Sequence, residues 1–151
     1  MIEINNLTNF IVDKKIFSTV AKKVLLGENR GIKTVSLAFV DKEEIKKLNK
    51  KYRKKNKPTD VLSFLINEKQ YLGEIIICPE IVKENVPTAK QSRIHHGKAI
   101  GTKKYQSDFK RELLKVFIHG ILHLCGYDHE KSKIMAEEME KKQEKYLSNI
   151  K

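Results

Sequence analysis

The spacing of hydrophobic and polar positions divides the chain into short apolar runs and longer amphipathic segments. Short runs rich in β-branched residues indicate strands, and apolar positions three or four residues apart indicate helices. The runs predict strands at residues 2–5, 34–40, 61–66 and 73–78. A short polar segment, NEKQY, lies between the last two strands, which favours a β-hairpin.

Helices are predicted where a capping residue precedes an amphipathic segment. Aspartate and serine side chains accept hydrogen bonds from the first free backbone amides of a helix, whereas glycine often ends it. The expected helices run from Asp13 to about Leu26, from Asp41 to the break at residues 56–58, briefly from Pro79, from about Phe109 to Cys125, and from about Ser132 to Leu147. Ser107 or Asp108 is the expected cap of the helix at 109–125.

The order β-α-β-α-β-β-α-α predicts an α+β fold, with helices packed on a small mixed sheet. Apolar residues surround the second half of the helix at 109–125, so this helix is expected at the centre of the core. The segment 85–106 is polar and weakly patterned, which predicts a basic loop. A length of 151 residues suits one domain, residues 1–151.

The chain carries a large positive charge that is concentrated in one segment. Lys and Arg number 31 against 19 Asp and Glu, which gives a net charge of +12. Such a charge attracts nucleic acid or an anionic membrane, although lysine enrichment also serves solubility or heat tolerance. Residues 46–57 hold eight basic residues and no acidic one, and this concentration favours a polyanionic partner.

Neither a membrane helix nor a signal peptide is expected. No apolar run approaches the ~20 residues of a membrane helix, and the segment MIEINNLTNF lacks a basic start followed by a long apolar stretch. Cys78 and Cys125 lie in apolar contexts, which favours reduced thiols. We therefore expect a cytoplasmic protein without a membrane partner.

Three histidines in the stretch FIHGILHLCGYDHE have the spacing of a metal site. His119 and His123 are four residues apart on the expected central helix, so their rings project from one face. Gly126 ends the helix and allows the chain to bring His129 back to the same point. Three imidazoles can hold one zinc ion and leave a fourth position for water, whose pKa the metal lowers to about 7.

The spacing H-x3-H-x5-H also occurs in zinc proteases, which carry a glutamate directly after the first histidine as general base. Gly120 occupies that position here, and glycine cannot move a proton. A zincin-like fold, with the metal-binding histidines on the central helix, is therefore expected. A metallopeptidase-like hydrolase remains an alternative that Gly120 and the positive charge disfavour.

Several segments resemble the motifs of the YbeY family. They are the histidine stretch itself (H-G-x-L-H-L-x-G-Y-D-H), Leu48-Asn49 with Tyr52-Arg53, the block PTDVLSF at 58–64, Leu72 to Ile75, and Met139 with Gln143-Glu144, which fit the family's C-terminal helix. The resemblance spans roughly residues 35–147, although Leu65 replaces the family's usual proline and the segment 85–100 is longer than usual.

The resemblance implies a zinc-bound endoribonuclease that is specific for single strands. It further implies a role in ribosomal RNA maturation, at the 3′ end of the small-subunit RNA, and in ribosome quality control in the cytoplasm. The implied partners are single-stranded ribosomal RNA and the ribosome or its proteins. The nucleophile is either metal-bound water or a ribose 2′-hydroxyl, and the sequence does not indicate which of them is used.

Arg53 matches the functional arginine of the family. A guanidinium binds two phosphate oxygens at once and keeps its charge, so Arg53 is expected to hold the scissile phosphate as a catalytic residue. Neighbouring lysines are expected to bind the RNA backbone without sequence preference, namely Lys50, Lys54, Lys55 and Lys57.

Two aspartates have alternative roles. Asp60 either orients a ligand imidazole or caps a turn. Asp128 is expected to shape the turn before His129 and to position the metal-binding side chains without binding the ion itself. If either were a fourth ligand, the zinc would be structural and the protein a non-catalytic ribosome assembly factor. His95 and His96, in the basic loop, are expected to be solvated.

Overall fold

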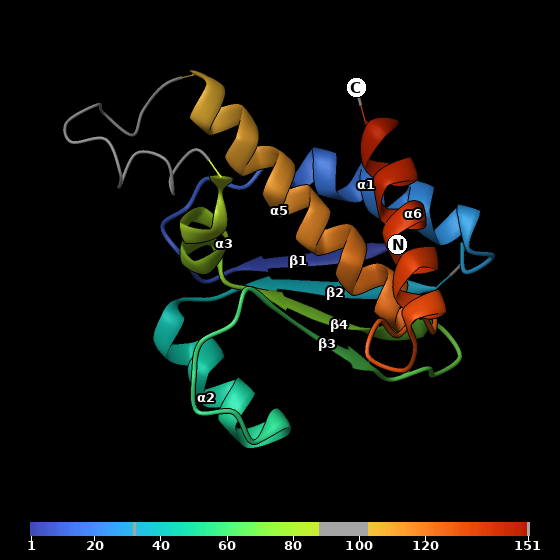
Figure 1. Ribbon diagram of the computed structural model, residues 1–151, viewed down its shortest axis with the longest axis horizontal. Coiled ribbons are helices and arrows are strands. Elements are labelled where there is room, and N and C mark those ends of the chain that lie inside the picture. Colours follow the sequence, from blue (N-terminus) through green and yellow to red (C-terminus); the bar gives the residue numbers. More distant parts are fainter. Residues whose placement is uncertain (32, 88–102, 151) are drawn as a thin grey trace.

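A mixed sheet of four strands is the centre of the fold (Figure 1). The computed structural model describes residues 1–31, 33–87 and 103–150. Its strands are β1 (Ile2–Asn6), β2 (Thr34–Phe39), β3 (Val61–Leu65) and β4 (Tyr71–Ile77). The helices in these ranges are α1 (Lys14–Gly27), α2 (Lys42–Arg53), α3 (Pro79–Asn85), α5 (Lys103–Leu124) and α6 (Lys133–Ser148).

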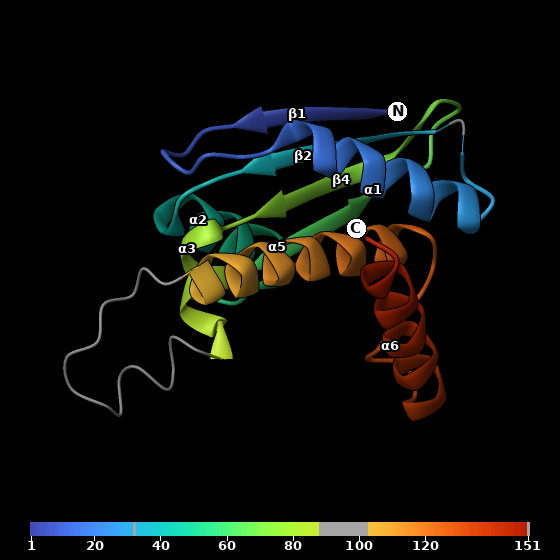
Figure 2. The ribbon, with the colours of Figure 1, turned by 90° about the horizontal axis from the view of Figure 1, so that it is seen from above.

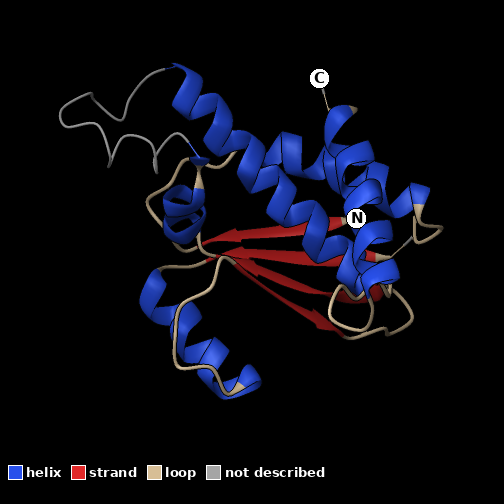
Figure 3. Ribbon diagram, viewed as in Figure 1, coloured by secondary structure: helices blue, strands red, loops and turns tan. Residues whose placement is uncertain are grey.

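The strands lie in the order β1-β2-β4-β3. The first three are parallel, whereas β3 is antiparallel to β4, with Ser63 opposite Ile75. The hairpin predicted around the segment NEKQY is therefore confirmed. Strand β3 forms one edge of the sheet, and Figure 3 shows α5 crossing in front of the strands.

Each face of the sheet buries a separate cluster of side chains, because successive residues of a strand point to opposite faces. On β4, Ile75 and Ile77 belong to the larger cluster, which includes residues of α1, α5 and α6. Ile76 belongs to the smaller cluster, where Ile45 of α2 is fully buried. Helix α5 thus covers one face, with α6 beside its C-terminal end, as Figure 2 shows, and α2 packs on the other.

The expected α+β class and most element positions are confirmed. The side chain of Asp13 accepts hydrogen bonds from Lys15 N and Ile16 N, and that of Asp41 accepts one from Glu44 N. Ser132 caps α6 in the same way. No helix in the described ranges is both long and apolar enough to cross a membrane.

The expected start of the central helix was wrong. Helix α5 begins at Lys103, so the expected caps Ser107 and Asp108 lie inside it. The reason is burial, because Tyr105 is only 8% exposed and packs with Val86 and Phe109. Residues 103–106 of the expected basic loop belong to α5, whereas residues 88–102, with His95 and His96, lie outside the described residues.

A buried carboxylate joins α1, the turn after α5 and α6. The Glu28 side chain is 7% exposed. It accepts hydrogen bonds from Tyr127 Oη at 2.9 Å, Tyr146 Oη at 2.6 Å and Lys142 Nζ at 2.9 Å. Burial alone would raise the pKa of Glu28, but the hydrogen bonds from Tyr146, Lys142 and Tyr127 outweigh it and lower the pKa below its ordinary value of 4.5.

Replacing this carboxylate by an amide, Glu28→Gln, is expected to lower the free energy of unfolding by about 1.5–3 kcal/mol at pH 7, because hydrogen bonds to a charged acceptor weaken. The native pKa is lowered, so the charge stabilises the fold above pH 4.5, and this stabilisation is lost as the pH falls through the native pKa. Urea unfolding of both proteins between acid pH and pH 7 measures the difference in their free energies of unfolding.

The matched control is Glu140→Gln, an exposed carboxylate on α6. We expect its stability to follow that of the wild type at every pH. Equal stability of Glu28→Gln and wild type at pH 7, or a difference that grows in acid, would contradict a stabilising buried carboxylate.

Candidate metal centre

Three imidazole rings converge at the C-terminal end of α5. His119 and His123 lie one helical turn apart on the same face, with ring centroids 4.6 Å apart. The ring of His129 lies 5.1 Å from that of His119 and 5.0 Å from that of His123. One ring nitrogen from each residue lies within 4.8 Å of the other two. The structure therefore brings the three predicted ligands together.

A tight turn after α5 returns His129 to the helix. The amide of Gly126 donates to the His123 carbonyl and that of Tyr127 donates to the Leu122 carbonyl, which is the Schellman arrangement of a helix end. Gly126 has a φ of +106°, a conformation that favours glycine. The Asp128 side chain accepts from Glu130 N at 2.9 Å and stabilises the last part of the turn.

The environment favours the neutral form of the two half-buried imidazoles. Burial, followed by the proximity of His123, lowers the pKa of His119 to about 4. Burial and the proximity of His129 also lower the pKa of His123. The Nε2 atoms of His119 and His123 lie 3.0 Å apart. Neutral imidazole is the form that binds metal through a free nitrogen lone pair.

The donor set fits an ion that prefers nitrogen ligands. Tetrahedral zinc with bonds of about 2.0–2.1 Å places its ligand atoms roughly 3.3 Å apart, close to the separation of the two Nε2 atoms. Among the described residues, the cluster that can hold a metal ion contains His119, His123 and His129, without a carboxylate or thiolate. Asp60 and Asp128 do not join it, so one side of the site stays open.

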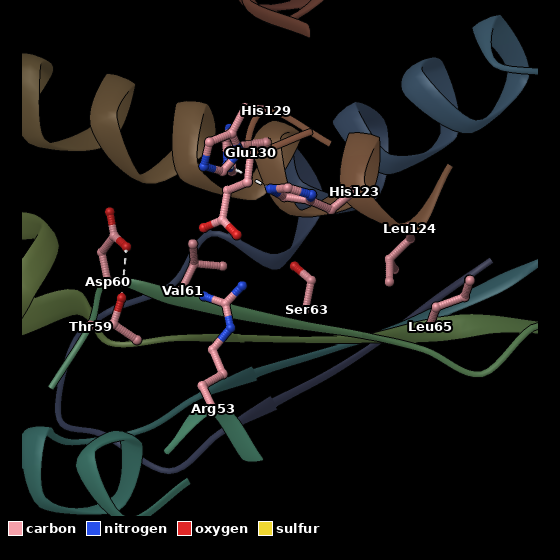
Figure 4. Close-up of a pocket in the computed structure, with 11 residues that line it drawn as sticks. Arg53, Thr59, Asp60, Val61, Ser63, Leu65, His123, Leu124, His129 and Glu130 are labelled. Carbon is pink, nitrogen blue, oxygen red and sulfur yellow. Dashed lines mark hydrogen bonds between the residues drawn. The ribbon is translucent and has the colours of Figure 1, made fainter. Parts of the chain in front are cut away.

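The three imidazoles open into a cleft of about 360 Å³. Its lining residues are Arg53, Thr59, Asp60, Val61, Ser63, Leu65, His119, His123, Leu124, His129 and Glu130. Figure 4 shows Arg53 extending from α2 toward Glu130, on the side opposite the histidines. The charge of Arg53 contributes to the lowered pKa of His123, in accord with this proximity.

The predicted RNA-binding lysines lie beside this cleft rather than inside it. Lys50, Lys54, Lys55 and Lys57 are exposed at the end of α2 and in the segment after it. Asn49, which is 2% exposed, donates from Nδ2 to the Lys57 carbonyl at 2.8 Å and fixes that segment to the helix. All four lysines lie within four residues of Arg53 along the chain, and we call them the basic surface beside the cleft.

The structure places Asp60 in the cleft, where its side chain accepts a hydrogen bond from Thr59 Oγ1 at 3.3 Å. The ring of His119 is instead contacted by Gln143 of α6, whose Oε1 lies 3.0 Å from His119 Nδ1. Gln143 matches the family's C-terminal helix in the sequence, but it was not expected at the site, because no local pattern connects it with the histidines.

Sequence reasoning also missed Ser63, although a signal was available. Residues 61, 63 and 65 of β3 share one face of the strand and all line the cleft. Gly120 lies against this strand, since a Cβ atom there would meet Ile75 Cγ2 at 3.0 Å and Ser63 Oγ at 3.1 Å. The position that holds the general base in zinc proteases is therefore packed against the sheet here.

Comparison with known proteins gives a consistent result. The model of the family described as Endoribonuclease YbeY matches residues 3–151. A protein named Endoribonuclease YbeY from Thermotoga petrophila is 42% identical over 116 residues, which are 77% of this chain and 67% of the relative. Another protein of that name, from Thermodesulfovibrio yellowstonii, is 40% identical over 143 residues, which are 90% of this chain and 80% of the relative.

A solved structure is also similar along almost the whole chain. The solution structure of a Thermotoga maritima protein is 35% identical and has a TM-score of 0.64, covering 99% of this chain and 89% of its own. The histidine cluster, the cleft and these similarities agree with the motifs found in the sequence. The chain belongs to the YbeY family of endoribonucleases.

Proposed function

We propose that this protein is a metal-dependent endoribonuclease that cleaves single-stranded RNA during ribosomal RNA maturation. One observation carries the proposal: the three imidazoles open into the same cleft that Arg53 enters from the opposite side. Membership of the YbeY family supports the reaction and the RNA substrate. Residues 1–151 would then constitute one metal-dependent hydrolase domain.

The metal is proposed to be a single zinc ion held by His119, His123 and His129. Three nitrogen donors with an open side are typical of catalytic zinc, whereas structural zinc has four protein ligands. When bound there, zinc would supply a Lewis acid and lower the pKa of a coordinated water. The cluster of three histidines without a carboxylate, among the described residues, supports this choice.

Arg53 is proposed to bind the scissile phosphate. Its planar guanidinium can donate two parallel hydrogen bonds to phosphate oxygens and offset the charge that develops on them. Glu130 lies across the cleft from Arg53, as Figure 4 shows, and its carboxylate is in reach of the same space. Both proposed nucleophiles, water and the ribose 2′-hydroxyl, are compatible with this arrangement.

The basic surface beside the cleft is proposed to bind the flanking RNA. Lys50, Lys54, Lys55 and Lys57 are exposed, so each can contact a phosphate of a strand that passes over the end of α2. Such contacts attract RNA of any sequence and weaken as salt rises. The net charge of +12 agrees with this role.

The site of action is proposed from the family alone. The ribosome or its proteins would present the RNA, the 3′ end of the small-subunit RNA would be a cleavage site, and the protein would act in the cytoplasm. Quality control of defective ribosomes would use the same chemistry.

Neither alternative function is favoured by a specific contact. A structural zinc in a non-catalytic assembly factor needs a fourth protein ligand, and no carboxylate of the described residues joins the three histidines. A metallopeptidase needs a general base next to the first ligand, and Gly120 is buried against the sheet instead.

Removal of one imidazole tests the proposed reaction. We expect His123→Ala to reduce cleavage of a labelled single-stranded RNA by more than about 100-fold, because two imidazoles hold zinc poorly. Gel analysis of zinc-loaded proteins measures the products. Lys141→Ala, an exposed change on α6 purified identically, should cleave like the wild type. Equal cleavage by His123→Ala would mean a contaminating nuclease or a reaction without this metal.

Arg53→Ala is expected to lower kcat by about 100- to 1000-fold, since a donor to the transition state is lost. Zinc affinity should not change, because Arg53 is not part of the histidine cluster. Single-turnover cleavage and zinc titration separate the two quantities.

The matched control is Lys55→Ala, which removes an exposed charge that does not line the cleft. Its kcat should stay close to that of the wild type. The plot of the logarithm of the RNA-binding constant against the logarithm of the salt concentration should become less steep by about 0.7, the value for one phosphate contact. If both variants lost kcat equally, Arg53 would be only part of the general positive charge.

A further inference from the structure

The Nδ1 atom of the His119 ring contacts the buried side-chain amide of Gln143. Gln143 of α6 is 6% exposed, and its Oε1 lies 3.0 Å from Nδ1 of His119. A carboxamide oxygen can accept a hydrogen bond but cannot donate one. His119 must therefore carry its proton on Nδ1 for this contact to be a hydrogen bond.

The location of that proton decides which nitrogen is free. A neutral imidazole has one N–H group, so a proton on Nδ1 leaves the lone pair on Nε2. The Nε2 of His119 is the atom that faces His123, at 3.0 Å from its Nε2. We propose that Gln143 is a positioning residue that fixes the tautomer and the ring orientation of His119 for metal binding. This inference rests on the proposed metal centre.

The three imidazoles differ in how they are held. Burial lowers the pKa of His123, whereas the backbone of Tyr127 acts to raise it, and this backbone influence does not depend on side-chain identity. His129 is exposed. Asp60, for which orienting a ligand imidazole was one of two expected roles, accepts a hydrogen bond from Thr59. Gln143 is therefore the side chain through which substitution can change the tautomer of a ligand.

Helix α6 is fixed well enough for Gln143 to act in this way. Its neighbours Lys142 and Tyr146 both hydrogen-bond the buried carboxylate of Glu28, at 2.9 and 2.6 Å. Met139, one turn earlier, is 1% exposed in the main core. Because the helix is anchored on both sides of Gln143, its amide has little freedom to move away from the ring.

The choice of an amide also affects the charge of the site. A carboxylate behind a ligand imidazole raises the basicity of that ligand, as in carboxylate–histidine–zinc triads. It would also add a negative charge next to a cleft that has to accept phosphate. Gln143 orients the imidazole without adding this negative charge. The positive charge of an ion bound by three neutral imidazoles is then not offset and can attract the phosphate of the substrate.

Two substitutions separate hydrogen bonding from shape. Gln143→Leu keeps a similar volume but removes the acceptor, and we expect zinc affinity to fall by about 10- to 100-fold. Gln143→Glu restores an acceptor and should bind zinc at least as tightly as the wild type. Competition with a chromophoric chelator measures both affinities. Wild-type affinity in Gln143→Leu, or equal weakening in Gln143→Glu, would overturn the proposal.

A matched control separates ligand orientation from stability. Leu147 is 3% exposed on the same helix and belongs to the main core, so Leu147→Ala destabilises the fold through a cavity. Its folded fraction should bind zinc with wild-type affinity. A loss of affinity equal to that of Gln143→Leu would mean that any loosening of α6 weakens the site, and the specific role of Gln143 would be wrong.

A measurement on metal-free protein keeps this inference distinct from the proposed function. The ¹⁵N chemical shifts of the His119 ring at pH 8 report which nitrogen carries the proton. We expect Nδ1–H in the wild type and a shift toward Nε2–H, the form that free histidine prefers, in Gln143→Leu. The same tautomer in both proteins would refute the role of Gln143. Absence of zinc binding by the wild type, with the expected tautomers present, would refute the metal centre alone.

Discussion

The crowding of three imidazoles around one point is the constraint on which the rest of the structure depends. With Nε2 atoms 3.0 Å apart, a positive charge on both His119 and His123 is strongly disfavoured, and burial lowers the pKa of His119 to about 4. Neutral rings that share one cation relieve this crowding. The helix end at Gly126 brings in the third ring, and the buried Glu28 fixes both that turn, through Tyr127, and helix α6.

The charges of α2 serve the fold and the cleft together. Glu43 and Glu44 lie in its first turn, and Lys50, Lys51 and Arg53 lie in its last turn, which suits the helix dipole at both ends. Because α2 packs on the face of the sheet opposite α5, its basic C-terminal end reaches the cleft from the other side of β3. Val61, Ser63 and Leu65 of this edge strand line the same cleft as the histidines and Arg53, which is where the proposed substrate strand would lie.

Local signals were sufficient for the elements and for the histidine cluster. The helical spacing of His119 and His123, the glycine at 126 and the caps Asp13 and Asp41 act within a few residues, so the sequence reveals them. The start of α5 could not be predicted, because the burial of Tyr105 depends on tertiary packing. Gln143 lies 24 residues from His119 in the sequence, and Glu28 lies 99 residues from Tyr127. No periodic pattern connects residues so far apart, so these contacts could not be predicted.

The central claim is that one metal ion is bound by three histidines and remains open to substrate. The X-ray absorption spectrum of zinc-loaded protein at the zinc K edge tests it most directly. We expect three imidazole nitrogens at about 2.0–2.1 Å and one further light atom that exchanges with added phosphate. A spectrum with four protein ligands, including a carboxylate or a thiolate, or one without multiple imidazoles would contradict an open site of three histidines.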